Sequence, residues 1–334
     1  MGRYVARRLI QFLPVILGTL FLLHLLSVLT IQIVGDPVRA LFGENAPPAA
    51  VIEQLQVEYN LDDPCLQQTA NPCVTLFVER MGQYVQGDFG VNFRGRAVTD
   101  LFMERIGVTL RLTAIAILFE TLVGITMGML AGLRKDKFFD NFVRVFTSVL
   151  VAFPTFVFGS LALLFLGLQF GLYLRESEWA PEWLGQMFQV GYDRDYPWLS
   201  LFLPGLVLGA FSLAAVARLT RTSLIENLRS DYVRTARAKG LTTRRTVGIH
   251  TLRNSLIPVV TYIGIDIGVL LGGALVTEGI FNVPGIGQLI FISVQANDTP
   301  VIIGVATILV IVFLVANLIV DILYAALDPR IRYE

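Results

Sequence analysis

Six long apolar blocks constrain this chain more than any other feature of its sequence. A helix needs roughly 20 apolar residues to cross a bilayer, and each block is about that long or longer. Lipid offers no hydrogen-bond partners to the backbone, so such blocks must be helical. They cover residues 9–34, 107–133, 143–172, 199–217, 257–277 and 301–327. The sequence therefore predicts an all-α, polytopic membrane protein with six transmembrane helices.

The basic residues are spread unevenly over the segments between these blocks. One alternate set of segments, with Arg144 at a helix edge, holds 18 Lys and Arg residues, and the other set holds 7. The two sets are 1–8, 134–142, 218–256 and 328–334 against 35–106, 173–198 and 278–300. Because Lys and Arg are enriched in cytoplasmic loops, we expect both termini and the loop 218–256 to lie in the cytoplasm.

The first block could be a cleaved signal peptide or a retained anchor. It follows Arg3, Arg7 and Arg8. It is longer than the apolar region of a signal peptide, which is about 7–15 residues, and it lacks a small-x-small site at its end. We expect it to remain as the first transmembrane helix.

The segment 35–106 is too long for a simple turn and is predicted to form a small extracytoplasmic cap, with a helix over 49–59. It contains Cys65 and Cys73, the only two cysteines of the chain. An oxidising exterior and an even count favour a disulfide between them, although two free thiols are the alternative. No His or third Cys accompanies the pair, so no metal site is expected.

The cytoplasmic loop 218–256 carries helix start and stop signals. Ser230 is placed to act as an N-cap, and Asp231 lies in the first turn, where negative charge suits the helix dipole. A short helix over 232–239 would then end at Gly240 as a C′ residue. A plain basic loop that touches anionic lipid would explain the charges but not these signals.

A second helix is predicted after this short one. Thr242 or Thr243 can cap it, and it would run toward Asn254. Pro258 then opens the fifth span, a tolerated position for proline. A capped helix, a glycine stop and a second helix in one loop suit docking into a groove of a partner protein.

Two spans carry glycines at every fourth residue. This small-xxx-small spacing lets helix backbones approach closely, so packing is the expected role, and a sliding interface is compatible with it. The two stripes are Gly124, Gly128 and Gly132 in the second span and Gly264, Gly268 and Gly272 in the fifth.

Two carboxylates lie near the middle of spans, where a charge costs at least ~2.5 kcal/mol and therefore faces protein or water. Glu120 continues the Gly124 stripe by one turn, and Asp266 lies one turn from Tyr262. These three residues are candidates for lining a translocation path. The alternative is a buried hydrogen-bonded group that locks two helices together.

The chain carries no motif of an enzyme that works alone. Its two histidines, His24 and His250, lie far apart in sequence, and neither H-E-x-x-H nor G-x-S-x-G occurs. None of the three lysines lies in a P-loop. We therefore expect no catalysis, no metal and no ATP hydrolysis by this chain alone.

A self-sufficient, ion-coupled secondary transporter is a rival reading. Such a protein would need internal repeats or helices broken at the membrane midplane. Pro154 and Pro204 could break helices, but the sequence shows no repeat. A pure scaffold is a third possibility, which the capped cytoplasmic helix disfavours.

Several motifs in order resemble one family over nearly the whole chain. Asp231-Tyr-Val-Arg-Thr-Ala-Arg-Ala-Lys-Gly240-Leu241, continued by His250-Thr-Leu-Arg-Asn-Ser-Leu-Ile-Pro258, is similar to the cytoplasmic loop of binding-protein-dependent ABC importer permeases of the dipeptide/oligopeptide branch (DppB/OppB type). The usual Glu-Ala-Ala start is replaced by Thr235-Ala236-Arg237. The other matching blocks are Tyr4-Val-Ala-Arg-Arg-Leu9, Gly35-Asp-Pro37, Gly87-Asp-Phe-Gly90, Val98-Thr-Asp-Leu101, Thr277-Glu-Gly-Ile-Phe281-Asn-Val-Pro284-Gly-Ile-Gly287 and Asn317 to Arg332.

The resemblance implies a type I ABC importer (MetI-like) permease fold in a bacterial plasma membrane, with an extracytoplasmic insertion after the first helix. It implies a first segment 1–34, a cap 35–106, a permease core 107–328 with the coupling loop 218–256, and a tail 329–334. Residues 231–241 would be the coupling helix that docks onto an ATPase. The expected contacts are Asp231, Tyr232, Arg234, Ala236, Lys239, Gly240 and Leu241.

The resemblance also implies the partners. They are a second homologous permease, two ATP-binding-cassette ATPase domains that bind ATP and Mg²⁺, an external substrate-binding protein and the lipid bilayer, with no nucleic acid. The implied activity is import of dipeptides or oligopeptides by alternating access. Nickel complexes, glutathione or haem are alternative cargoes of the same architecture.

Overall fold

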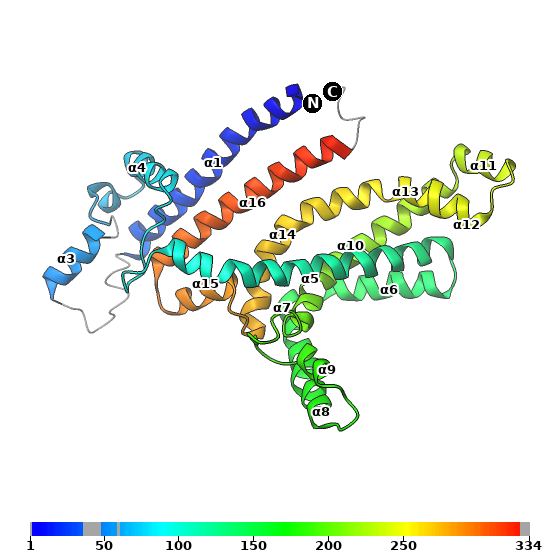
Figure 1. Cartoon of the computed structure of the whole chain (residues 1–334). Coiled ribbons are helices and arrows are strands. Elements are labelled where there is room, and N and C mark those ends of the chain that lie inside the picture. Colours follow the sequence, from blue (N-terminus) through cyan, green and yellow to red (C-terminus); the bar gives the residue numbers. More distant parts are fainter. Residues whose placement is uncertain (1, 36–47, 59–60, 328–334) are drawn as a thin grey trace. The chain divides into compact units, whose positions relative to one another are not determined.

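The computed structural model describes residues 2–35, 48–58 and 61–327, and Figure 1 shows its helices. Over these ranges the chain is helical, with one isolated bridge between Val91 and Ala97 and no strand. This confirms the all-α fold class. The blocks Gly35-Asp36-Pro37 and Asn317 to Arg332 and the tail 329–334 lie partly or wholly outside the described residues.

Each of the six predicted spans overlaps a helix or, for the third, a run of helices. They are α1 (Gly2–Val34), α5 (Val98–Leu133), the run α7–η2–α8 (Thr155–Ala162, Leu163–Phe170 and Gly171–Glu176), α10 (Phe202–Leu228), α14 (Ile257–Phe281) and α16 (Thr299–Leu327). Five helices of the described part are long and apolar enough to cross a membrane, or up to seven spans if each of two bent helix pairs counts as one. α14 belongs to both of these bent pairs.

The third span does not begin where the sequence predicted. A single helix over 143–172 was expected, but α6 (Phe138–Ala152) ends at Phe153, whose backbone is extended with φ −79° and ψ 136°. Pro154 follows, and the residue before a proline is driven out of the helical region. The span therefore starts again at Thr155. Its middle, η2, is a π-type helix that hydropathy could not have revealed.

Other helices run past their apolar blocks. α5 begins at Val98 instead of 107, and α10 continues to Leu228 instead of 217. Hydropathy marks the lipid-crossing part of a helix and not its ends. Pro204 breaks nothing, because it lies in the first turn of α10, where its missing N–H has no helical acceptor. Two short helices, α9 (Glu182–Met187) and α15 (Ile286–Gln295), were not predicted.

The chain divides into two compact units, Met1–Gly107 with Gly285–Glu334, and Val108–Pro284. The permease core expected over 107–328 stays a prediction. In the first unit α16 packs along α1. The start of α5 joins α15 and α16 in one apolar cluster that includes Val98, Phe102, Ile286 and Val305. These contacts explain why the last helices belong with the first.

The cap belongs to this first unit. It contains α3 (Ala49–Glu58), the 3-10 turn η1 (Pro64–Gln67) and α4 (Val74–Val85). A disulfide joins Cys65 to Cys73. His24 of α1 lies with Nε2 3.1 Å from the carbonyl oxygen of Cys73, and Arg80 of α4 lies with Nη1 3.4 Å from His24 Nδ1. Because a carbonyl only accepts, Nε2 carries the hydrogen and Nδ1 accepts from Arg80.

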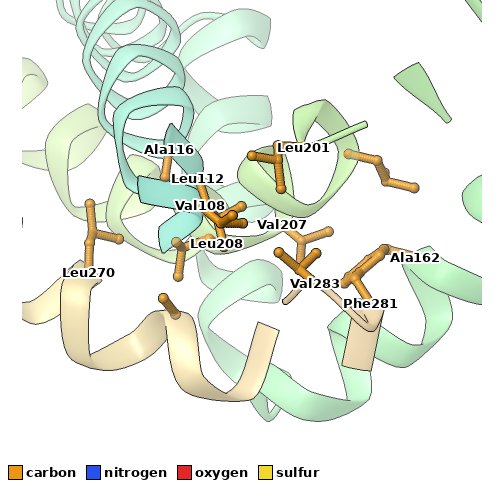
Figure 2. Close-up of a cluster of buried hydrophobic side chains, with 12 residues drawn as sticks. Val108, Leu112, Ala116, Ala162, Leu201, Val207, Leu208, Leu270, Phe281 and Val283 are labelled. Carbon is orange, nitrogen blue, oxygen red and sulfur yellow. The ribbon is translucent and has the colours of Figure 1, made fainter. Parts of the chain in front are cut away.

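The second unit is built from α5 after Gly107, α6 to α10, the cytoplasmic loop and α14. α10 packs on α6, α7 and α14. Figure 2 shows side chains of α5, α7, α10 and α14 converging in one apolar cluster that includes Leu112, Ala162, Val207, Leu270 and Phe281. In Figure 1, α11 and α12 lie beyond the end of α10, away from this cluster.

Candidate functional site

The short cytoplasmic helix α11 (Asp231–Ala238) is present where the sequence predicted it. Ser230 occupies the N-cap position with φ −70° and ψ 154°, and Asp231 lies in the first turn. The Ser230 hydroxyl does not cap the helix, however. It donates instead to the carbonyl oxygen of Asn227 at 2.6 Å, so it ties α11 back to the end of α10.

Gly240 ends α11 as predicted. Its φ is +80°, a left-handed conformation that costs other residues about 1–2 kcal/mol. The N–H of Gly240 donates to the carbonyl of Arg237 at 2.9 Å, and that of Leu241 donates to Ala236 at 3.2 Å. This pair of bonds is a Schellman motif, which satisfies the last carbonyls of the helix and turns the chain sharply.

The two faces of α11 differ. Val233 and Ala236 are buried, and the helix packs on the π-type helix η3 (Thr246–Thr251). Tyr232 and Arg234 of α11 are exposed, and so is Lys239 just after the helix. Ala236 was expected to contact a partner, but only 8% of its surface is exposed. The i, i+3 spacing of Val233 and Ala236 makes them the inner stripe of α11, so Ala236 positions the helix.

Asn227 fixes α11 against α10. The Tyr232 hydroxyl donates to Asn227 Oδ1 at 2.7 Å, and the Asn227 amide donates to the carbonyl of Ser223 at 2.9 Å. On the other side of the loop, Ser255 donates to the carbonyls of Thr251 at 2.8 Å and Ser223 at 3.4 Å. These side-chain bonds connect α11 and the end of the loop to α10.

The second predicted helix is three short segments in a row. Thr242 caps α12 (Thr243–Arg245) by accepting from the Arg245 N–H at 3.4 Å. η3 and α13 (Leu252–Ser255) follow, and the run 243–255 meets α14 at a bend of 44°. Pro258 lies in the first turn of α14, as expected. The sequence gave no signal for the π-type segment.

The first glycine stripe packs α5 on α10. A Cβ added to Gly124 would lie 2.8 Å from Val216 Cγ1. One added to Gly128 would overlap the carbonyl oxygen of Ala217. Gly132 faces Leu224 in the same way, at 3.1 Å from Cδ2. The backbones therefore approach as the spacing predicted.

The second stripe does not form one packing face. Gly268 is buried and Gly264 is half-buried, but a Cβ on Gly272 would have no neighbour within 4 Å. No described helix of this chain covers α14 at Gly272. Close packing on α5 comes instead from α10, where Gly209 lies against Ala116.

The two carboxylates within spans lie side by side in the second unit. Glu120 of α5 has Asp266 of α14 and Ser212 of α10 as neighbours, and Tyr262 lies beside Asp266 and Ser212. Glu120 is 0% exposed and Asp266 4%, whereas Tyr262 is half-buried. This burial favours the helix-locking reading over a water-lined path for Glu120. The described residues contain no group of three or more His, Cys, Asp or Glu that could hold a metal ion.

Residues 124–333 match the model of the family described as "Binding-protein-dependent transport system inner membrane component". The match includes α11, Gly240 and the whole cytoplasmic loop. The chain belongs to this permease family. It is therefore a multi-pass inner membrane protein and a transport permease, not an enzyme of a catalytic family.

Relatives of this permease match along its entire length. The "Glutathione transport system permease protein GsiC" of Escherichia coli (strain K12) is 36% identical over 336 residues, covering 100% of both chains. The proteins of the same name from Shigella dysenteriae serotype 1 and Shigella boydii serotype 4 are also 36% identical with the same coverage. The resemblance to the dipeptide/oligopeptide branch of importer permeases is thereby confirmed.

Sequence reasoning missed several residues that hold the permease loop in place. Asn227, Ser223 and Ser255 make its fixing bonds, and Val233 fills its inner face. Asn227 and Ser223 are four residues apart on α10, and Val233 and Ala236 are three apart on α11, so helical spacing could have found these two pairs. The bond between Ser255 and Ser223 joins residues 32 positions apart and has no sequence signal.

Proposed function

We propose that this chain is a permease subunit of an ATP-driven importer and that α11 is its coupling helix for a partner ATPase. The observation that carries the proposal is the construction of α11. Val233 and Ala236 pack inward and the Tyr232 hydroxyl bonds to Asn227, while Arg234 and Lys239 are exposed. A rigid, exposed, cationic helix at the end of α10 suits a groove on another protein.

The set of proposed coupling contacts is smaller than the set expected from the sequence. Asp231, Tyr232, Arg234, Lys239 and Gly240 are exposed and available to a partner. Leu241 is half-buried, so it contributes less surface. Ala236 is buried and is proposed to position α11 instead of contacting the ATPase. ATP binding would bias the pair of ATPases toward one state, and the bonded loop would carry that bias into α10.

The proposed cargo is a short peptide. The branch to which the motifs belong supports a dipeptide or an oligopeptide as the cargo. The name of the E. coli relative, a glutathione transport permease, supports a cargo of about three residues. Nickel complexes and haem remain the alternatives. A second permease of the same family, an external binding protein and two ATPase domains, which hold ATP and Mg²⁺, would complete the transporter.

In the proposed topology both termini and the loop 218–256 are cytoplasmic, and the disulfide-bonded cap faces the binding protein. The 18-to-7 distribution of basic residues supports it. Of the three pathway candidates, Tyr262 is proposed to line the translocation path because it is half-buried. Asp266 is buried beside Tyr262 and is proposed to position it. Glu120 is assigned to the interior of the unit.

Uptake into proteoliposomes tests this proposal. The chain is reconstituted with its companion permease, ATPases and binding protein, and uptake of radiolabelled glutathione and of a dipeptide is measured with ATP or with an imposed ion gradient. The proposal predicts ATP-dependent uptake that competing peptides inhibit and ionophores do not. Uptake driven by the gradient without ATP would establish the ion-coupled alternative. ATP-dependent uptake of nickel or haem, with none of either peptide, would reject only the cargo.

A further inference from the structure

The hairpin of α8 and α9 in the second unit borders a polar cavity. The two helices pack on each other, and Figure 1 shows them beyond α7. Two glycines permit the contact. A Cβ on Gly171 would overlap the carbonyl oxygen of Phe188, and one on Gly185 would lie 3.0 Å from Arg175 Cγ. The cavity has a volume of about 560 Å³, which lies in the range of small-molecule sites.

Arg175 of α8 lines this cavity and is held by a neutral partner. Its Nη2 donates to Oε1 of Gln189 at 3.1 Å, and the Gln189 side chain is buried, with 9% exposure. The ion pairs of the described residues involve other arginines and a lysine, so no carboxylate of this part of the chain neutralises Arg175. A guanidinium fixed by an amide keeps its charge for a carboxylate ligand, which it can bind with two parallel hydrogen bonds.

Two carboxylates, Glu182 and Asp193, line the same cavity. Glu182 is the first residue of α9, and Asp193 is held in a turn in which its Oδ1 accepts from the Asp195 N–H at 2.8 Å. Neither forms an ion pair with Arg175 or another described residue, so charges of both signs are kept apart around one cavity. Separated charges of opposite sign complement a zwitterion, whose ammonium donates and whose carboxylate accepts.

Gln186 and Gln189 add neutral polar groups to the cavity wall. Oε1 of Gln186 and Nε2 of Gln189 have no hydrogen-bond partner within the described part of the chain. The chain itself therefore leaves one acceptor and one donor for whatever fills the cavity. A peptide group has one N–H and one C=O and matches both.

The tryptophans indicate where this hairpin lies. All three tryptophans of the chain, Trp179, Trp183 and Trp198, fall in the segment 173–198 and are exposed. Tryptophan is enriched where a membrane meets water. In the proposed topology the segment 173–198 is extracytoplasmic. The cavity would then open close to the outer surface of the membrane, where cargo arrives.

We propose that this cavity is an entry site that binds the charged ends of a short peptide. Arg175 binds the terminal carboxylate, and Glu182 and Asp193 bind the terminal ammonium. Two extended residues span about 7 Å, which a cavity of this volume accommodates. The inference rests on the proposed peptide cargo and adds a contact that the permease itself makes with it.

Protection of an introduced thiol tests the site directly. The two native cysteines are joined to each other, so Ala180→Cys on the cavity wall gives this subunit a single reactive thiol. The assembled permease and ATPase complex is labelled with a maleimide in the presence of the dipeptide alanyl-alanine. The peptide at twice its Kd should slow labelling about threefold, since only the empty site reacts. Glu178→Cys, in the same segment but outside the cavity, should not be protected.

Blocked peptides and charge variants separate recognition from a structural role of the hairpin. In Ala180→Cys, the N-acetylated and the C-amidated dipeptide should protect less than the free one. Adding Arg175→Gln should remove the preference for a free carboxylate, and adding Glu182→Gln should weaken the preference for a free amine. Arg194→Gln, exposed and outside the cavity, should keep both preferences. No protection, or equal protection by free and blocked peptides, would overturn the site and leave the hairpin a structural element.

ATP-driven uptake by the same complex with its binding protein distinguishes failure of the site from failure of the proposed function. Peptide uptake without protection of Ala180→Cys would leave the permease function standing and remove this cavity as a peptide site. Protection without peptide uptake would keep the binding site and reject peptides as the cargo. Absence of both would reject the cargo and the site together.

Discussion

The guanidinium of Arg221 on α10 makes a bidentate ion pair with the carboxylate of Asp140 at the start of α6. Nη2 lies 2.7 Å from Oδ2, and Nε bonds to Oδ1. The Asp140 side chain is fully buried, and its Oδ2 also accepts from the Asp136 N–H at 2.9 Å. A two-pronged bond of this kind fixes direction as well as distance, so it sets how α6 lies against the cytoplasmic end of α10.

Asp140→Asn should destabilise the second unit by about 3–5 kcal/mol, because removing one partner leaves a partly buried guanidinium without its charge. Arg221→Lys should also lose stability, since an ammonium cannot make the two-pronged contact. Thermal unfolding of the purified transporter measures both. Lys135→Gln, at a largely exposed pair with Asp136, is the control and should shift nothing. A wild-type melting temperature for Asp140→Asn would contradict this role.

The same pair predicts a dependence on pH. The hydrogen bonds from Arg221 hold the pKa of Asp140 below its ordinary value. The stabilisation is therefore complete above the ordinary Asp pKa of about 3.9 and is lost as the pH falls through the lower folded-state value. Stability of the wild type should fall more steeply with acid than that of Asp140→Asn. Parallel curves for the two proteins would reject the linkage.

Gly128→Ala should weaken the contact between α5 and α10. The added methyl would overlap the carbonyl of Ala217 and lie 2.6 Å from Thr220 Cβ, and such overpacking costs about 1–3 kcal/mol. Gly107→Ala on the same helix has no neighbour within 4 Å, so it should be neutral or slightly stabilising. Melting temperatures of the two variants in one detergent make the comparison. Equal values would show that the glycine stripe does not hold these helices.

Removing the disulfide should loosen the cap without disturbing the second unit. Cys65 and Cys73 are eight residues apart, and a loop of that size is worth about 2–3 kcal/mol in the chain-entropy model. The double variant Cys65→Ser with Cys73→Ser should be cleaved faster by protease within the cap. Alkylation of denatured, unreduced wild type should add no mass. Addition of two alkyl groups would show free thiols instead.

The helices and the loop signals were predictable because each depends on local chemistry. Asp231 and Gly240 lie where their local preferences predicted, Ser230 precedes the helix without capping it, and hydropathy located six spans but misplaced the start of the third. Long-range arrangement was not predictable in the same way. The pairing of Arg221 with Asp140 spans 81 residues, and the meeting of Glu120 with Asp266 depends on how three helices pack.

Prediction failed where a local rule was outweighed or not applied. Pro154 was recognised as a possible helix breaker, yet the apolar run 143–172 suggested one continuous span. Ala236 was expected among the coupling contacts because residues 231–241 resemble a coupling helix. Its spacing from Val233 places it on the buried face of α11, which packs on η3.

The proposed coupling of this permease to an ATPase depends on α11 and on its end at Gly240. Proline fixes φ near −65° and has no N–H, so Gly240→Pro is incompatible with the observed φ of +80° and with the bond to Arg237. Gly248→Ala in the same loop, where an added methyl meets nothing within 4 Å, is the matched control. ATP-driven peptide uptake and substrate-stimulated ATP hydrolysis are measured together in proteoliposomes that contain equal amounts of each variant. Gly240→Pro is expected to abolish both, and Gly248→Ala is expected to retain both. Uptake by Gly240→Pro at the wild-type rate would show that α11 is not the coupling helix.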